Sequence, residues 1–140
     1  MEQQVLLTIV SSQRFMSEEA EETKLVTEGI MQLTDERIEI SYAETELTGL
    51  VGTRTSFCIE KDRVSLKRSG SVESVMTFMP GHEDHSLYDM GFGALMITIR
   101  TERIACDIGH NGGTLQVAYG IVIEDETAGF IEYRIDVKVK

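Results

Sequence analysis

The sequence predicts an all-β fold, a closed antiparallel up-and-down barrel of about 8–10 strands, in a single domain that spans residues 1–140. Three observations predict it. Apolar residues recur with a period of two in most segments, short polar turns separate those segments, and the chain has 1 proline against 12 glycines. A helix would spread alternating apolar residues around its circumference, whereas a strand places them on one face of a sheet.

The first half of the chain contains five expected strands, at 4–12, 23–33, 37–44, 53–60 and 63–68. In the third of these, Ile38, Ile40 and Tyr42 alternate with polar residues, and in the fifth Val64 and Leu66 do the same. The turns between them are short and rich in charged residues, which is typical of hairpin connections.

A short helix could begin within residues 17–24 and would be compatible with a barrel. Ser17 could cap such a helix, and the acidic residues that follow would suit its first turn. Beyond Lys24 the alternation from Leu25 to Leu33 favours a strand.

The second half contains five more expected strands, at 72–79, 86–91, 94–107, 113–123 and 131–140. The last is the clearest, because alternate residues from Ile131 to Val139 are apolar and those between them are charged. The strand at 94–107 is expected to bend or break near Thr101.

Short connections reverse the chain, so neighbouring strands should pair as antiparallel hairpins. An open sheet of about ten strands would leave two long edges exposed, and closure into a barrel removes both. A β-sandwich is the alternative architecture.

The net charge of −11 excludes some functions. Nucleic-acid binding depends on neutralising phosphates with Lys and Arg, so an acidic protein is not expected to bind DNA or RNA. The five cations between Arg54 and Arg68 are more typical of a solvated face.

The compartment is expected to be the cytoplasm. The longest N-terminal apolar run, Val5 to Val10, is too short for an export signal or a membrane span, so no membrane partner is expected. Cys58 and Cys106 are too few for a disulfide framework and are expected to be small buried residues.

Several fragments, in their order and spacing, resemble one protein family. They are Thr27-Glu28-Gly29, Ile40-Ser41-Tyr42-Ala43-Glu44, Lys67-Arg68-Ser69-Gly70, Met76-Thr77-Phe78, Tyr88-Asp89-Met90-Gly91-Phe92-Gly93 and Gly113-Thr114-Leu115-Gln116-Val117-Ala118-Tyr119. From about Thr27 to Tyr133, the chain is similar to the YwiB-like family of small bacterial proteins of unknown function. The resemblance implies a calycin (lipocalin-like) barrel. Calycins often hold a small hydrophobic ligand inside the barrel, which is an analogy at the level of fold.

The alternation predicts a polar cluster inside the barrel. Tyr42 and Glu44 continue the apolar face of their strand, Arg68 continues the face of Val64 and Leu66, and Tyr119 lies on an apolar face. Tyr133 also lies on the apolar face of its strand, and Tyr88 is expected to join the cluster.

A buried charge is costly unless it is paired, so one interpretation of this cluster is an Arg68–Glu44 ion pair near one mouth of the barrel. The other is a binding site in which Arg68 and the tyrosines hold the anionic or polar head of a ligand.

Three functions therefore stay open. The first is a binding protein for a small polar-headed or anionic hydrophobic ligand. The second is a protein-interaction module with a filled barrel and an acidic surface, and the third is an enzyme that uses the interior cluster. No catalytic motif and no cofactor are expected. His82-Glu83-Asp84-His85 is expected to be a solvated loop rather than a metal site, because its histidines are three apart with no helical context.

Overall fold

The structure, a computed structural model, describes residues 2–15, 19–45, 51–71, 73–89, 94–123 and 126–140. Its secondary structure consists of ten strands. They are β1 (Glu2–Phe15), β2 (Glu21–Leu33), β3 (Arg37–Ala43), β4 (Thr53–Glu60), β5 (Val64–Gly70), β6 (Ser74–Phe78), β7 (Glu83–Asp89), β8 (Ala94–Gly109), β9 (Gly112–Ile123) and β10 (Glu126–Val139). No helix able to cross a bilayer is found in this part of the chain.

The predicted all-β up-and-down barrel is confirmed: all pairings are antiparallel, and the sheet order is β6-β5-β4-β3-β2-β1-β10-β9-β8-β7. The first strand pairs with the last, from Val5 opposite Val139 to Phe15 opposite Gly129. The barrel is nearly closed, because within the described ranges β6 and β7 lie side by side without a ladder between them.

Side-chain acceptors connect β6 to β7, and the residue after β6 to β8. The Thr77 amide donates to Asp84 Oδ2 at 3.3 Å, and the Met79 amide donates to Thr101 Oγ1 at 3.1 Å. Each bond gives a backbone amide at the edge of the sheet a side-chain acceptor, in place of the carbonyl that a paired strand would supply.

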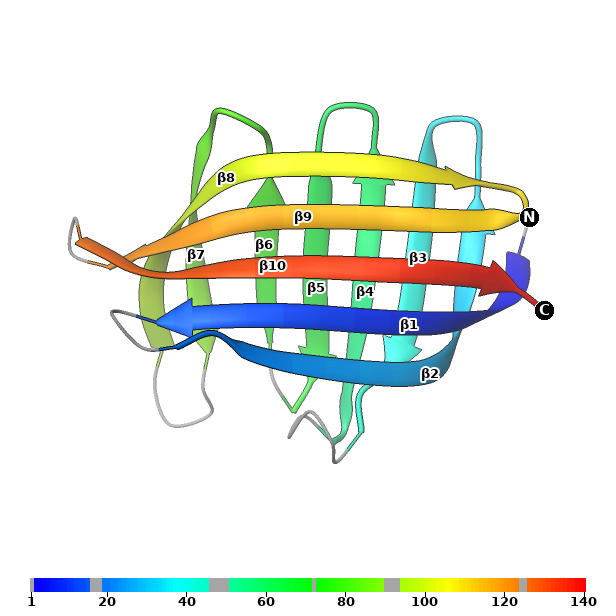
Figure 1. Ribbon diagram of the computed structural model, residues 1–140, viewed down its shortest axis with the longest axis horizontal. Coiled ribbons are helices and arrows are strands. Elements are labelled where there is room, and N and C mark those ends of the chain that lie inside the picture. Colours follow the sequence, from blue (N-terminus) through cyan, green and yellow to red (C-terminus); the bar gives the residue numbers. More distant parts are fainter. Residues whose placement is uncertain (1, 16–18, 46–50, 72, 90–93, 124–125) are drawn as a thin grey trace.

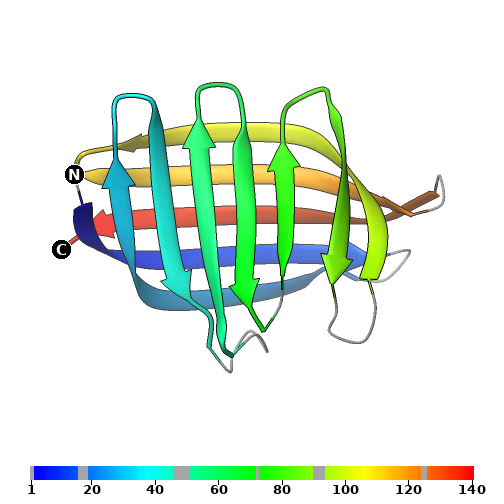
Figure 2. The same ribbon diagram turned by 180° about the vertical axis from the view of Figure 1, so that it is seen from behind.

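The barrel is flattened into two layers whose strands cross steeply. In Figure 1 the long strands β1, β2, β8, β9 and β10 run across the front, and β3 to β7 run behind them. Figure 2 shows the second layer from its own side. The inner faces of both layers therefore enclose one core.

The core of the β3–β6 layer consists of apolar rows that run across the strands. In one row Phe57 of β4 lies opposite Ile40 of β3 and Leu66 of β5, and Leu66 lies opposite Met76 of β6. The next row contains Ile38, Ile59, Val64 and Phe78. Seven of these eight side chains are buried and Ile38 packs against them, so this half of the barrel is filled.

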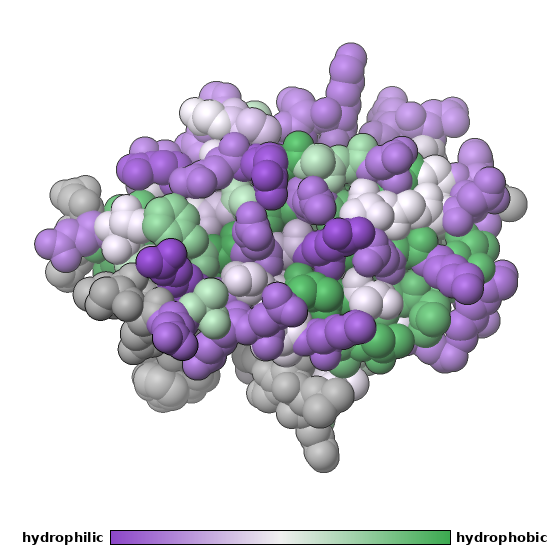
Figure 3. Space-filling model, viewed as in Figure 1, coloured by the Kyte–Doolittle hydropathy of each residue, from purple (hydrophilic) through white to green (hydrophobic). Residues whose placement is uncertain are grey.

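The front layer has an apolar strip on its outer face, over β1 and β2, within a mostly hydrophilic surface (Figure 3). This outer strip consists of exposed Val26 and half-buried Leu6, Val10 and Ile30. Ladder partners of these residues, such as Lys24 beside Val10, give the strip a charged border.

The expected break near Thr101 is confirmed as a β-bulge. The register of β8 against β9 shifts between Thr101 and Arg103. Before the shift the odd-numbered residues Ile97 and Ile99 are buried, and after it the half-buried apolar residues are the even-numbered Ile104 and Ile108. One extra residue reverses which set of side chains faces the core.

The structure decides against the helical alternative over the described part of 17–24, and it shows that one expectation, of buried cysteines, was wrong. Residues Glu21 to Lys24 are strand rather than helix, because they pair with Gln13 to Val10 of β1 and so satisfy their backbone in the ladder. The cysteines are not buried: Cys58 is half-buried on the outer side of β4, and Cys106 is exposed near the end of β8.

Gly29 of β2 is a position where close packing requires the absence of a side chain. A Cβ there would lie 2.7 Å from Leu7 Cδ1 and 2.7 Å from the Ser41 carbonyl oxygen. Gly29→Ala is therefore expected to lower the free energy of unfolding by about 1–3 kcal/mol, measured by urea denaturation. Gly109→Ala is the matched control, because a Cβ there meets no atom within 4 Å. Equal stability of the two variants would contradict this packing.

Candidate functional site

The inward rows of the β3–β6 layer change from apolar to polar toward one mouth of the barrel. Beyond the Phe57 row, Thr55 of β4 lies opposite Tyr42 of β3 and Arg68 of β5, and Arg68 lies opposite Ser74 of β6. One step further, the Glu44 amide donates to the Thr53 carbonyl at 2.9 Å. These inward polar rows consist of Tyr42, Thr55, Arg68, Ser74, Glu44 and Thr53, and all except half-buried Arg68 are buried.

A cavity of about 270 Å³ lies against these rows. It forms where the layers separate, since over the described residues β2 pairs with β3 only from Ile30 to Leu33. The N-terminal half of β2 stays with β1, while Tyr42 and Glu44 lead away from it. The cavity is lined by Ile9, Ser11, Gln13, Thr23, Leu25, Tyr42, Glu44, Arg68 and Tyr133.

Hydrogen bonds orient the two charged side chains of the cavity. The Thr55 hydroxyl donates to Glu44 Oε1 at 2.6 Å, a short bond of the kind that a carboxylate accepts. Arg68 Nη2 donates to the Tyr133 hydroxyl at 3.3 Å. Glu44 is only 7% exposed, so its carboxylate is held in a site largely removed from bulk water.

Aromatic rings fill the space behind Tyr133. Its ring centroid lies 6.0 Å from that of Phe57 in an edge-on contact, and 6.3 Å from that of Tyr119 in a stacked contact. Tyr119 in turn lies 4.5 Å from Phe78. This aromatic group joins the cavity wall to the apolar rows of the core.

Burial raises the pKa of the Tyr42 phenol well above its usual value of 10. The nearby Glu44 carboxylate raises this pKa further, both by its charge and by a hydrogen bond, while Arg68 lowers it. Tyr42 therefore stays a neutral hydrogen-bond donor in the folded protein.

This shift predicts how stability depends on alkaline pH. In the unfolded chain Tyr42 loses its proton above about pH 10, whereas in the fold it keeps it. The contribution of Tyr42 to the free energy of unfolding is fully present below that pH. Above it, this contribution falls by about 1.4 kcal/mol per pH unit. Urea denaturation should show that the stability difference between the wild type and Tyr42→Phe narrows above about pH 10. A difference that is constant with pH would contradict the buried phenol.

Three of the five predicted site residues, Tyr42, Glu44 and Arg68, line the cavity together. Tyr119 does not line it but stacks on Tyr133, which does. Tyr88 lies in β7, opposite Leu95, and its side chain is outside the described residues.

Sequence reasoning missed most of the opposite wall, which consists of Ile9, Ser11, Gln13, Thr23 and Leu25. The signal was present in β1, where Ser11 and Gln13 continue the inward face of Leu7 and Ile9. The same rule would have found Thr55, which shares its face with Phe57 and Ile59.

The segment from His82 to His85 was expected to be a loop, and this was wrong from Glu83 onward, where β7 begins. Glu83 forms an ion pair with Arg100 at 3.3 Å, and His85 Nδ1 lies 3.0 Å from Thr98 Oγ1. Successive strand residues point to opposite faces, so Asp84 points away from Glu83 and His85 and bonds to the Thr77 amide instead. Across the residues that the structure describes, no three potential metal ligands cluster.

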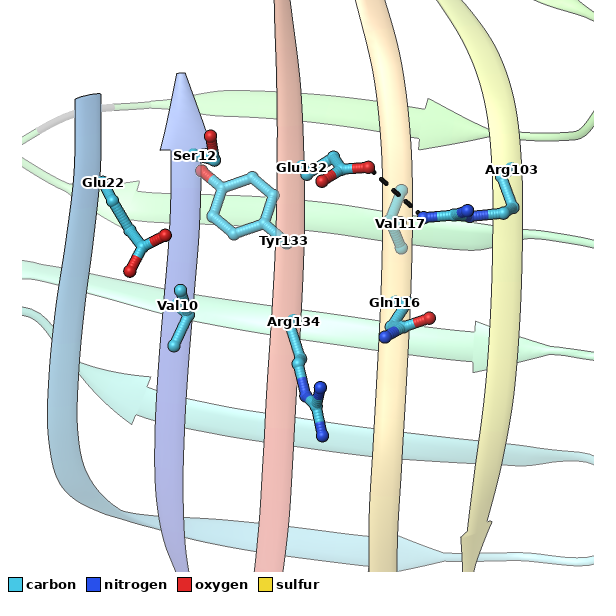
Figure 4. Close-up of a pocket in the computed structure, with 9 residues that line it drawn as sticks. All are labelled: Val10, Ser12, Glu22, Arg103, Gln116, Val117, Glu132, Tyr133 and Arg134. Carbon is cyan, nitrogen blue, oxygen red and sulfur yellow. Dashed lines mark hydrogen bonds and ion pairs between the residues drawn. The ribbon is translucent and has the colours of Figure 1, made fainter. Parts of the chain in front are cut away.

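A second hollow, of about 240 Å³, lies on the front layer (Figure 4). Arg103 and Glu132 reach toward each other across β9 and form an ion pair at 3.2 Å. The exposed fractions of the two side chains are 60% for Arg103 and 62% for Glu132. Exposed pairs of this kind contribute little energy, so the interior cavity is the better candidate for a site.

The fold and the site define a class: a ten-stranded antiparallel barrel with an apolar core and one polar, cavity-bearing mouth. The chain belongs to the family described as a domain of unknown function, DUF1934, whose model matches residues 7–135.

The chain is also similar to a named relative and to a solved structure. The chain is 28% identical over 100 residues to "Uncharacterized beta-barrel protein YwiB" of Bacillus subtilis (strain 168), covering 71% of this chain and 69% of that protein. The crystal structure of the ywiB protein from Bacillus subtilis matches with a TM-score of 0.82 and 21% identity, over 96% of this chain and 92% of that one. The expected YwiB-like resemblance is confirmed, and the structural match shows a shared fold.

Proposed function

We propose that this protein is a non-catalytic binding protein of the cytoplasm that holds a small polar or anionic ligand in the cavity at its polar mouth. The observation that carries the proposal is the change of the inward rows from apolar to polar where they meet the cavity. Apolar residues would fill these positions at lower cost if packing were their only role, since buried polar groups must be desolvated.

The chemistry of the cavity favours a polar ligand group. Arg68 presents a guanidinium, which can donate two parallel hydrogen bonds to a carboxylate or phosphate. Ser11, Gln13 and Thr23 add neutral hydrogen-bonding groups on the facing wall. The assignment to the calycins, whose members often hold ligands, stays a prediction that agrees with this role.

The test starts with native mass spectrometry of the purified protein to detect a retained small molecule. A thermal-shift screen of carboxylates and phosphates follows. Arg68→Met is expected to weaken binding of any anionic hit by about tenfold or more, as loss of a charged hydrogen bond does. Arg103→Met is the matched control, because Arg103 sits on the outer face in an exposed ion pair. Equal effects of both variants, or no binding by any probe, would contradict the proposal.

A protein-interaction module is the second candidate, and the outer strip favours it. Val26 is 55% exposed within that strip, and the chain has a net charge of −11. Contiguous exposed apolar residues with a polar rim are typical of contact surfaces. If no small molecule is found and Val26→Glu changes the sedimentation coefficient of the protein, this candidate replaces the first.

A further inference from the structure

Among the described residues that line the cavity, one side chain is cationic and one is anionic. These are Arg68 and Glu44, and the other described lining residues are uncharged. The charges of this described lining therefore balance. A ligand with a carboxylate alone gains from Arg68 but is repelled by Glu44, and unfavourable like-charge contacts in a desolvated site are costly.

The two charged residues are placed to contact one small molecule at two points. Arg68 lies on β5 opposite Thr55, and Glu44 follows β3 and is bonded to Thr53, so one strand, β4, separates them. Their backbones are separated by about 10 Å across that strand, and both side chains reach into the same cavity. Thr55 and Tyr133 hold the two heads at separate places, through the bonds to Glu44 and Arg68.

The size of the cavity limits the ligand. A volume of about 270 Å³ lies below the range of about 300–1,000 Å³ that drug-sized ligands occupy. The filled row of Phe57 and the aromatic group behind Tyr133 occupy the inner end of the cavity. Ile9 and Leu25 provide a small apolar surface on the facing wall.

We propose that the ligand of this cavity is a compact zwitterion, with its carboxylate at Arg68, its ammonium group at Glu44 and a short aliphatic group against Ile9 and Leu25. An aliphatic α-amino acid has this chemistry. The inference rests on the proposed function and narrows it, since it excludes fatty acids and simple anions as the best ligands. Complementary charges at both ends orient such a ligand in one way only.

Three probes with one branched carbon skeleton test the inference by titration calorimetry: L-leucine, 4-methylpentanoate and 3-methylbutylamine. The wild type is expected to bind leucine at least about tenfold more tightly than either of the others. Arg68→Met should weaken binding of leucine and 4-methylpentanoate, because both present a carboxylate. Glu44→Gln should weaken binding of leucine and 3-methylbutylamine, and it should leave or improve binding of 4-methylpentanoate.

Glu132→Gln is the matched control, because Glu132 is on the outer face of β10. If 4-methylpentanoate binds as tightly as leucine, and Glu44→Gln does not weaken leucine binding, the zwitterion is excluded while the proposed binding function stands. If none of the three probes binds and native mass spectrometry shows no retained molecule, both proposals are overturned.

Discussion

Phe57→Ala is expected to lower the free energy of unfolding by about 3–5 kcal/mol, the range measured when a buried aromatic ring is truncated. Phe57 is fully buried, at 0% exposure, in the middle of the apolar row that crosses β3 to β6. Its ring also contacts Tyr133 of the opposite layer. The substitution removes apolar surface from the core and leaves a cavity that closely paired strands cannot close.

Urea denaturation measures this loss, and Phe130→Ala provides the matched control. Phe130 is also a strand phenylalanine, but it is 48% exposed on the outer face of β10. Its truncation is expected to change the free energy of unfolding by no more than about 0.5 kcal/mol. A loss below about 1 kcal/mol for Phe57→Ala would mean that the filled apolar half of the barrel does not carry its stability.

The strands could be predicted from the sequence because each needs only its own alternation. The final strand shows this most clearly: Ile131, Tyr133, Ile135 and Val137 were expected on one face, and all four are buried. The bulge in β8 was also readable, because the odd-numbered apolar residues up to Ile99 give way to even-numbered ones from Ile104.

Apolar alternation could not predict where β2 starts, or that a strand begins just after His82. Local preference suggested a helix before Lys24, but pairing with β1 decides the structure there. Similarly, Glu83 to His85 show no alternation of apolar residues, and they form a strand because β8 pairs with them. Long-range hydrogen bonding overrides local preference in both places.

The candidate site was predictable only on one side. Tyr42, Glu44 and Arg68 continue apolar faces, so their inward direction follows from a period of two. The residues that face these three side chains across the cavity depend on where β2 separates from β3. Pairing between the strands sets that point, and the sequence alone does not show it. The cavity itself, and the contact of Arg68 with Tyr133 across 65 positions, therefore required the structure.

Thr55→Val is expected to lower the free energy of unfolding by about 1.5–3 kcal/mol, the range for a hydrogen bond to a charged group. Valine matches the shape of threonine, so the packing of this fully buried side chain changes little, but the hydroxyl that donates to Glu44 is lost. The carboxylate then loses one donor at a buried position, where water replaces it poorly.

Thr114→Val makes the same chemical change in a different setting. The Thr114 hydroxyl also donates to a carboxylate, Asp136 Oδ1 at 2.9 Å, but this pair is only half-buried, so water can take the place of the hydroxyl. Its loss is expected to cost less than about 1 kcal/mol. Comparison of the two variants by urea denaturation therefore isolates the effect of burial on a bond of one type. Equal costs would mean that water reaches Glu44 freely, and the polar mouth would then lack the desolvated charge on which selective binding of a zwitterion depends.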